Sequence, residues 1–384
     1  MSGDASVGVG DVVEVDVTRV ATGGEGVARA PDGRTLFVAG ALPGERVRAA
    51  VVEIRRRHGR AEVAEVVVAA PGRRRPPCPH VAHGCGGCDW QHVTGDLQAD
   101  LRRTIVRDAL ERIGRIADPV VEAGITLPAG AGRTTVRAAV VDGRAGYRRR
   151  HSHDVVAPRT CMVVHPRLEQ MLVQGRYADG EVLLRVGDRT GDEAAVALPV
   201  EDDEVGVIHE VAGDRRWRIS ARSFFQPSPQ AADALVEEVR DAVGDIHGGT
   251  MVDLASGVGL FAGTVGAPFR EVVAVEAAPT AVADAEVNLA DLPVRTVRST
   301  IERWTPERAE VVVADPPRAG LAAAGVDRVV ATGAPTVVLV SCDAASLGRD
   351  AGLLAAAGYR LERSRVLDLF PQTSHVEVVS RFVR

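Results

Sequence analysis

Apolar residues recur at two different spacings along this chain, and the change of spacing divides it. Over residues 8–68, short runs of alternating apolar and polar residues are separated by turn sequences rich in glycine and proline. This pattern predicts β-strands joined by tight turns. Five or so strands of this length make a small closed β-barrel of the oligonucleotide-binding kind. We therefore expect such a barrel at the start of the chain.

The rest of the chain changes character twice. After a segment rich in proline and arginine, apolar residues at Leu97, Leu101, Ile105, Leu110 and Ile113 recur at helical spacing. Residues 119–222 are again β-rich, with no topology readable from the pattern. From residue 223 strand-like and helix-like segments alternate. That alternation predicts an α/β domain with a mostly parallel sheet covered by helices.

Composition indicates a soluble globular protein of two or three domains. The chain has 384 residues, of which 46% are apolar and 26% charged. No segment approaches the roughly 18 consecutive apolar residues that a membrane-spanning helix needs, and no signal sequence is recognisable. Five cysteines spaced for metal binding rather than for pairing favour a reducing compartment. We expect a cytoplasmic protein.

The charge distribution is more informative than the net charge of −6. All basic side chains are arginines, and three clusters (residues 55–60, 73–75 and 148–150) lie within the first 150 residues. Each cluster alone is compatible with a solvated surface. Together they favour a phosphate-binding face, because guanidinium groups match phosphate oxygens, and RNA is the expected partner.

The cysteines form two groups. Cys78, Cys85 and Cys88 lie close together in CPHVAHGCGGC, and Cys161 stands alone downstream. Three clustered thiols and a distant fourth are typical of a Cys₄ site for an iron–sulfur cluster or for zinc. Cys342 follows an apolar run and precedes a helix-like segment. A catalytic nucleophile is often displayed there, although a lone cysteine after a strand can also be a small buried apolar residue.

A glycine-rich turn follows the first strand of the α/β region. In DLASGVG, Asp253 ends the strand and Gly257 and Gly259 form the turn, while Glu276 ends the next strand. Such a turn lets the backbone approach a ligand, and the second acid can bind ribose hydroxyls. The spacing lacks the third glycine of dinucleotide sites, so it suits S-adenosylmethionine better than NAD. The alternative is a tight turn with a structural aspartate.

Three more polar residues are predicted at the same edge of the sheet. Asp315 begins DPPRAG after one strand, Cys342 follows another, and Glu377 begins the last. A methyl donor, a thiol and a carboxylate form a coherent reaction on uracil. A thiolate adds to carbon 6, carbon 5 takes the methyl group, and a base removes the remaining proton at carbon 5.

These motifs together resemble the RNA uridine-5 methyltransferases, which make 5-methyluridine in 23S ribosomal RNA and in the tRNA T-loop. The resemblance rests on DLASGVGLF, DPPRAG, VSCDAASLGRD and DLFPQTSHVE, with SFFQPSPQAADAL ahead of them. GEGVAR and ALPGERV resemble the TRAM domain, an RNA-binding barrel, and CPHVAHGCGGC with Cys161 resembles the family's four-iron four-sulfur site. The resemblance covers nearly the whole chain.

The resemblance implies a role for individual residues. Cys342 would be the nucleophile and Glu377 the base at carbon 5. The cofactor or target-base contacts would be Gln226, Asp253, Ala255, Gly257, Gly259, Glu276 and Asp315, and the four-iron four-sulfur cluster would be held by Cys78, Cys85, Cys88 and Cys161. Ala255 stands where the family usually has an aromatic residue, and Leu260 where some members have asparagine.

The implied fold class is a Rossmann-like methyltransferase domain with an N-terminal barrel of oligonucleotide-binding type and a β-rich central domain carrying the Cys₄ site. In this family the segment near 93–120 packs with the catalytic domain, which makes the central domain discontinuous. The expected domains are a TRAM barrel over 1–70, a central domain of 71–92 and 121–222, and a methyltransferase domain of 93–120 and 223–384.

The resulting hypothesis is an S-adenosylmethionine-dependent RNA (uracil-5-) methyltransferase acting on 23S ribosomal RNA. The tRNA T-loop is the alternative substrate. A non-catalytic RNA-binding protein with a metal-stabilised fold is a rival of another class, as is a redox enzyme that uses the cluster. Zinc is the alternative metal. We expect no membrane contact and no obligate protein partner.

Overall fold

The computed structural model describes residues 6–128, 130, 132–150, 152–199 and 206–384. The remaining positions of the predicted domains, residues 1–5 of the barrel and 129, 131, 151 and 200–205 of the central domain, lie outside this description. The chain divides into two compact units. The barrel unit comprises Met1–Val81, Cys88–Ile105 and Gln372–His375, and the sheet unit comprises Ala82–Gly87, Val106–Pro371 and Val376–Arg384.

The barrel unit contains a closed five-stranded barrel with the strand order β1-β2-β3-β5-β4, which confirms the predicted barrel. Alternate residues point inward, such as Val47, Ala49 and Val51 on β4, and form a separate apolar core. The strands are β1 Val12–Val20, β2 Gly26–Arg29, β3 Thr35–Ala39, β4 Arg46–Ile54 and β5 His58–Val68.

Segments far apart in sequence meet in the rest of the barrel unit. After the 3₁₀ turn η1 (Pro79–Val81), helix α1 (Gly95–Arg112) confirms the helix predicted from the apolar spacing; it lies in this unit as far as Ile105. Arg102 of α1 donates to the carbonyl oxygens of Thr373 at 2.7 Å and His375 at 2.9 Å. Charged donors make these the stronger kind of hydrogen bond, so α1 holds the segment Gln372–His375.

The sheet unit is built on an eight-stranded sheet in the order β16-β15-β14-β17-β18-β20-β19-β6. Strands β16, β15, β14, β17 and β18 run parallel, and β20 runs antiparallel to both of its neighbours. The strands are β6 Val121–Thr126, β14 Thr250–Leu254, β15 Glu271–Glu276, β16 Val294–Arg298, β17 Val311–Ala314, β18 Thr336–Ser341, β19 Arg360–Asp368 and β20 Glu377–Val383.

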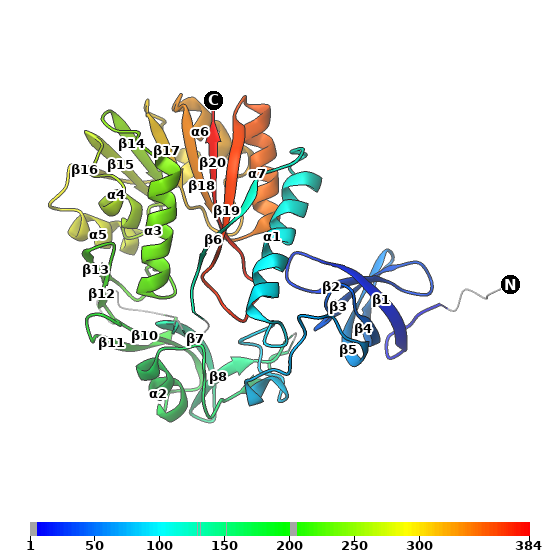
Figure 1. The fold of residues 1–384 in the computed structure, drawn as a ribbon. Coiled ribbons are helices and arrows are strands. Elements are labelled where there is room, and N and C mark those ends of the chain that lie inside the picture. Colours follow the sequence, from blue (N-terminus) through cyan, green and yellow to red (C-terminus); the bar gives the residue numbers. More distant parts are fainter. Residues whose placement is uncertain (1–5, 129, 131, 151, 200–205) are drawn as a thin grey trace. The chain divides into compact units, whose positions relative to one another are not determined.

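Both faces of this sheet are covered, which explains why its central strands are almost continuously apolar. Val338 and Val340 of β18 belong to the core that contains α3, while Val337 and Leu339 are equally buried and point to the other face. Helix α3 packs on β18 and β20, and α7 packs on β18 and β19, on opposite faces (Figure 1). The helices are α3 Pro229–Val243, α4 Leu260–Thr264, α5 Pro279–Asn288, α6 Ala322–Ala331 and α7 Ala344–Ala356, with the 3₁₀ turn η2 Ile301–Arg303.

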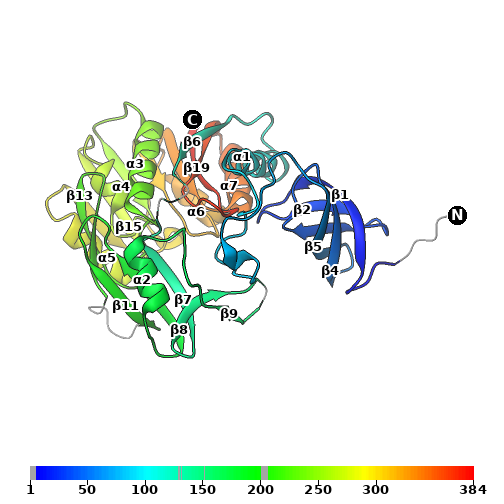
Figure 2. The same ribbon diagram turned by 60° about the horizontal axis from the view of Figure 1, so that its bottom comes forward.

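A second, smaller sheet lies in the same unit, as the β-rich pattern of 119–222 predicts. Its strand order is β11-β10-β7-β8-β9, and α2 packs against β7, β8 and β10 (Figure 2). A separate β12–β13 hairpin follows and contacts α3 and α5. The elements are β7 Thr135–Val141, β8 Arg144–Arg148, β9 Val155–Val156, α2 Pro166–Gln174, β10 Gly180–Val186, β11 Glu193–Leu198, β12 Ile208–Ala212 and β13 Arg215–Ile219.

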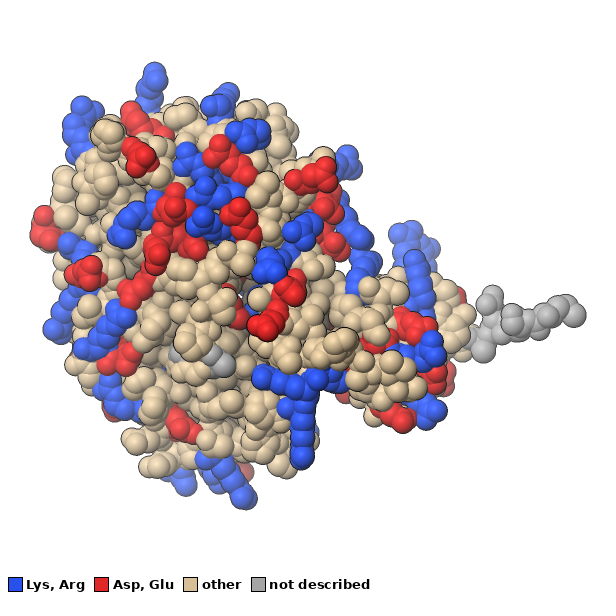
Figure 3. All heavy atoms as spheres, in the orientation of Figure 1, with Lys and Arg blue, Asp and Glu red and all other residues tan. Residues whose placement is uncertain are grey.

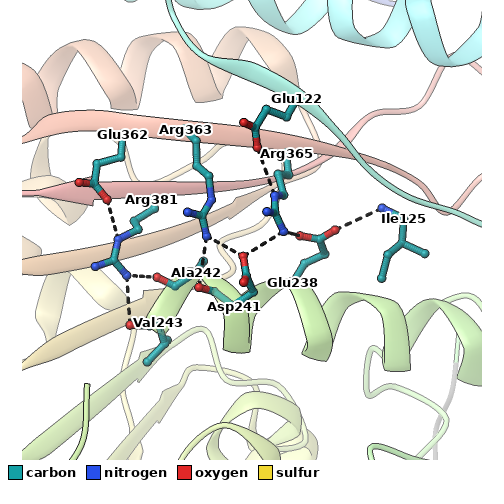
Figure 4. Close-up of polar contacts among 10 residues, drawn as sticks. All are labelled: Glu122, Ile125, Glu238, Asp241, Ala242, Val243, Glu362, Arg363, Arg365 and Arg381. Carbon is teal, nitrogen blue, oxygen red and sulfur yellow. Dashed lines mark hydrogen bonds and ion pairs between the residues drawn. The ribbon is translucent and has the colours of Figure 1, made fainter. Parts of the chain in front are cut away.

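Charged side chains of both signs are intermixed on the face seen in Figure 3. One such group joins α3 to the strands β19 and β20 (Figure 4). Within it, Arg365 contacts Glu238 at 3.0 Å and Asp241 at 2.9 Å. Among the residues that the structure describes, no helix combines the length and the apolar character needed to cross a bilayer.

Candidate active site

The predicted chemical residues of the α/β region meet at one edge of the large sheet. Asp315 follows β17, and its backbone N–H donates to Leu254 at the end of β14 at 3.1 Å. Cys342 follows β18, whose last residue, Ser341, pairs with Val378 of the antiparallel β20. Glu377, the first residue of β20, therefore lies beside the end of β18. The structure brings Cys342, Asp315 and Glu377 together where parallel strands end, which is where α/β folds bind ligands.

The glycine-rich turn occupies the same edge, between β14 and α4. Three of its residues have left-handed backbone angles: Ala255 with φ 60°, Gly257 with φ 56° and Gly259 with φ 97°. Position 259 also has no room for a side chain, because a Cβ there would lie 2.7 Å from the side chain of Leu289. Ala255 is the one residue of this turn that pays a steric penalty for the left-handed conformation.

Glu276, at the end of β15, folds its carboxylate onto this turn. Oε2 accepts from the N–H of Gly257 at 2.9 Å, and Oε1 accepts from the N–H groups of Ala277 and Ala278 at 2.7 Å each. The side chain is thus fixed between the turn and the start of α5. A carboxylate held at this place can accept hydrogen bonds from the hydroxyl groups of a ribose.

Asp253 is completely buried beneath the turn. Its Oδ2 accepts from the N–H of Ala262 in α4 at 2.9 Å, whereas Oδ1 has no hydrogen-bond partner among the described residues. Burial, with the nearby negative charges of Asp315 and Glu276, raises the pKa of the Asp253 carboxyl to about 8. The contact to α4 shows that Asp253 supports the start of this helix.

The groups around Cys342 share an electrostatic environment that disfavours negative charge. Burial, and then the carboxylates of Glu377 and Asp315, raise the pKa of the Cys342 thiol to about 11, while Arg318 acts in the opposite direction. Burial raises the pKa of Asp315 to about 7, and burial with the charge of Asp315 raises the pKa of Glu377 well above its usual range. Arg318, in DPPRAG, is a residue that sequence analysis did not single out.

Gln226 lies in the segment that leads into α3. Its side chain is buried, while Phe224, two residues earlier, is 68% exposed. The preceding turn is held by Asp284 of α5, which accepts from the hydroxyl groups of Ser220 at 2.8 Å and Ser223 at 2.7 Å. Asp284 was also missed by sequence analysis. The available signal was a charged residue among apolar helix positions that the spacing predicts to be buried.

The four cysteines of the predicted Cys₄ site are divided between the two units. Cys78 and Cys88 belong to the barrel unit, and Cys85 and Cys161 belong to the sheet unit. In the sheet unit Cys85 forms a β-bridge with Arg149, and the Cys161 sulfur lies 3.8 Å from the hydroxyl group of Tyr147. Both thiols therefore neighbour the β8 segment. Within the described part of the chain, no group of three or more His, Cys, Asp or Glu side chains is arranged to hold a metal ion.

Comparison with known proteins adds independent information. Residues 7–64 match the family model of the TRAM domain. An uncharacterized RNA methyltransferase of Streptomyces avermitilis is 34% identical over 97% of this chain and 98% of its own length. The 23S rRNA (uracil(1939)-C(5))-methyltransferase RlmD of Alkalilimnicola ehrlichii is 31% identical over 97% of this chain and 96% of its own.

A solved structure shares the fold. The tRNA (uracil-54, C5)-methyltransferase of Pyrococcus abyssi, in complex with S-adenosyl-L-homocysteine, superimposes with a TM-score of 0.74 at 22% identity. The match covers 96% of this chain and 99% of that one. At this identity the likeness establishes the fold.

Proposed function

The chain belongs to the RNA uridine-5 methyltransferase family, and we propose that it methylates carbon 5 of a specific uridine in 23S ribosomal RNA. One observation carries the reaction: Cys342, Asp315 and Glu377 lie at the sheet edge that also bears the glycine turn. The choice of ribosomal RNA is supported by relatives named as 23S rRNA methyltransferases in Alkalilimnicola ehrlichii and Halomonas elongata.

In the proposed reaction, S-adenosylmethionine would supply the methyl group as an electrophile and leave as S-adenosylhomocysteine. The Cys342 sulfur donates an electron pair to carbon 6 of the uracil, and carbon 5 gains the nucleophilic character to take the methyl group. Glu377 then removes the proton left on carbon 5. The electron pair of the broken carbon-5–hydrogen bond re-forms the 5,6 double bond, and the Cys342 thiolate leaves carbon 6.

The electrostatics of the site support the role of Glu377 as the base and oppose the ionisation of Cys342 in the free protein. A raised pKa makes the Glu377 carboxylate a stronger base near neutral pH than an exposed glutamate. The Cys342 thiol has to lose its proton before it attacks; burial and the carboxylates of Glu377 and Asp315 oppose that loss, and Arg318 favours it. Asp315 is half-buried beside both groups, and it would exchange a proton with them or contact the target base.

We assign the cofactor to the glycine turn. Gly257 and Gly259 would let it approach the backbone, Glu276 would bind its ribose, and Ala255 would offer only backbone and a methyl group. Asp253 would act from beneath the turn through its hydrogen bond to α4. Gln226 is proposed to contact the cofactor or the target base.

We further propose that Cys78, Cys85, Cys88 and Cys161 bind a four-iron four-sulfur cluster. The proposal rests on the spacing of these cysteines in the sequence, three close together and one distant, and on the resemblance of that spacing to the family's site. No step of the reaction needs the cluster. Anaerobic purification followed by iron, sulfide and zinc analysis tests it: iron with brown absorbance is expected, and zinc alone or no metal would reject it.

Nucleotide-resolved mapping of 5-methyluridine in a strain that lacks this protein tests the proposed function. Loss at one or two uridines of 23S ribosomal RNA, restored by the wild-type gene but not by a Cys342→Ala variant, is the expected result. Loss only in the tRNA T-loop would keep the reaction and replace the substrate. Unchanged 5-methyluridine in both RNAs would favour a non-catalytic RNA-binding protein.

A further inference from the structure

The turn Ser220–Ser223 leads directly into the segment that bears Phe224 and Gln226. The N–H of Ser223 donates to the Ser220 carbonyl at 3.0 Å, so the four residues form a tight turn, and both serines are buried. The exposed Phe224 comes immediately afterwards, and Pro227 is held by Thr134, whose N–H donates to its carbonyl at 2.8 Å. The position of the Phe224–Gln226 segment therefore depends on how this turn is fixed.

Asp284 of α5 fixes the donors of the turn. Its carboxylate is completely buried, and its Oδ2 accepts from the Ser220 N–H at 2.8 Å and from the Ser223 hydroxyl at 2.7 Å. Its Oδ1 accepts from the Ser220 hydroxyl at 2.8 Å and from the guanidinium of Arg218. Four donors satisfy the full accepting capacity of a carboxylate.

Arg185 of β10 fixes the acceptors of the same turn. This buried guanidinium donates to the Ser220 carbonyl at 3.0 Å and to the Ser223 carbonyl at 3.1 Å. Burial lowers the pKa of Arg185 to about 10 and the charge of Asp284 opposes that shift, so Arg185 is charged at neutral pH. One buried anion and one buried cation thus hold opposite sides of one turn.

Asn288, one helical turn after Asp284, connects this arrangement to the glycine turn. Its Oδ1 accepts from the Arg218 N–H at 2.7 Å, and its Nδ2 donates to the Arg218 carbonyl at 3.0 Å. The same Nδ2 donates to the carbonyl of Val258, between Gly257 and Gly259, at 3.1 Å. Helix α5 therefore touches both the glycine turn and the strand that leads into Ser220–Ser223.

We propose that Asp284, Arg185 and Asn288 are positioning residues that couple the glycine turn to the Phe224–Gln226 segment. The inference rests on the proposed function, in which the cofactor occupies the glycine turn and Gln226 contacts the cofactor or the target base; of these two contacts it takes the one to the target base. When the cofactor binds and orders the glycine turn, it would favour the conformation of the Phe224–Gln226 segment that receives the uridine. By linkage, RNA would raise cofactor affinity by the same factor.

The test measures cofactor binding and methyl transfer separately. Titration calorimetry gives the Kd of S-adenosylmethionine alone, and the Kd of S-adenosylhomocysteine with and without a 23S ribosomal RNA fragment. Single-turnover assays give the methyl-transfer rate. We expect Asp284→Asn to lower that rate by about 100-fold, because a displacement near 1 Å costs this much. Its Kd for S-adenosylmethionine alone should stay within about threefold of wild type, and RNA should no longer change S-adenosylhomocysteine affinity.

Two further variants keep the test decisive. Ser223→Ala removes one donor to Asp284 but keeps both buried charged residues, Asp284 and Arg185. It should therefore fold like wild type and lower the methyl-transfer rate by about tenfold. Asp291→Asn changes an exposed carboxylate that pairs with Arg215 at 2.6 Å, and it should behave as wild type. Wild-type rates and RNA effects in both Asp284→Asn and Ser223→Ala would overturn the inference. If Asp284→Asn weakened cofactor binding without RNA by the same factor as it lowers the methyl-transfer rate, Asp284 would have only a general structural role.

Failure of the proposed function gives a different result. If the wild-type protein binds S-adenosylmethionine but methylates neither ribosomal RNA nor tRNA, the proposed function is wrong and the coupling inference falls with it. If the wild-type protein methylates RNA while both variants equal it, only the coupling inference is wrong.

Discussion

Two groups of carboxyl side chains in the sheet unit differ in whether a cationic side chain pairs with them. Glu238 of α3 is 5% exposed, and it contacts Arg365 at 3.0 Å and accepts from the Ile125 N–H at 3.2 Å. Glu377, the first residue of β20, is also 5% exposed. Across the described residues, the structure gives Glu377, Asp315 and Asp253 no ion pair with a cationic side chain.

The difference separates structural charges from chemical ones. A buried carboxylate with a cation and an N–H donor is satisfied, and removing a partner affects stability. Buried carboxyls that lie near one another without cations hold their protons more tightly than usual, and such groups are typical of active sites. Burial alone would not have distinguished Glu238 from Glu377.

Replacing Cys342 should give the largest effect. Cys342→Ala removes the sulfur that adds to carbon 6, and losing a nucleophile costs more than about 10⁴-fold in rate. The thiol is only partly buried, so thermal unfolding should change little. Single-turnover transfer of a labelled methyl group to ribosomal RNA measures the loss. A residual rate within about tenfold of wild type would mean that another residue attacks the base.

Replacing Glu377 should stop the reaction at a later stage. Glu377→Gln keeps the size of the side chain but cannot remove the carbon-5 proton, so methylated uracil should stay bonded to Cys342. A protein–RNA adduct that survives denaturing electrophoresis is the expected observation. Glu362→Gln is a matched control, because Glu362 of β19 forms an ion pair with Arg381 of β20 at 2.8 Å and should give no adduct. Normal turnover by Glu377→Gln would assign the base elsewhere.

The raised carboxyl pKa values predict how stability depends on pH. Between the unfolded pKa of Asp253, 3.8, and its folded pKa of about 8, the folded state binds more protons than the unfolded state. The free energy of unfolding should therefore fall as pH rises through this window. Asp253→Asn removes the titrating group, so the decrease in the free energy of unfolding over this pH range should be smaller than in wild type by on the order of 1–3 kcal/mol. Denaturant unfolding from pH 5 to pH 8 measures both proteins, and identical slopes would contradict the burial argument.

Sequence patterns predicted the parts of this molecule that have a local or periodic signal. The barrel strands, the helix over 97–113 and the alternation after residue 223 follow from spacing alone. The convergence of Cys342 and Asp315 followed from a general rule for parallel strands. Glu377 reaches the same edge because its strand runs antiparallel, and the sequence analysis did not predict that direction.

Residues that act through long-range contacts had a weaker signal. Apolar helix positions around Asp284 predict its burial, but its partners Ser220 and Ser223 are more than 60 positions away, so local spacing does not identify them. Arg185 looks like any polar residue of a half-buried strand until its guanidinium is found buried against two carbonyls. Their importance depends on tertiary packing, which local spacing does not encode.

The smallest effect should come from the satisfied charges between α3 and the strands β19 and β20. Among the described residues, Arg365→Ala leaves the buried Glu238 carboxylate with the Ile125 N–H as its remaining donor, and we expect the free energy of unfolding to fall by about 2 kcal/mol. Arg363→Ala is the matched control (Figure 4), because its partner Asp241 is 50% exposed and such pairs contribute about 0–1 kcal/mol. Both variants should methylate RNA at wild-type rates once folded. Denaturant unfolding and single-turnover assays measure the two quantities, and a large rate loss with normal stability would show that this charge network also serves the reaction.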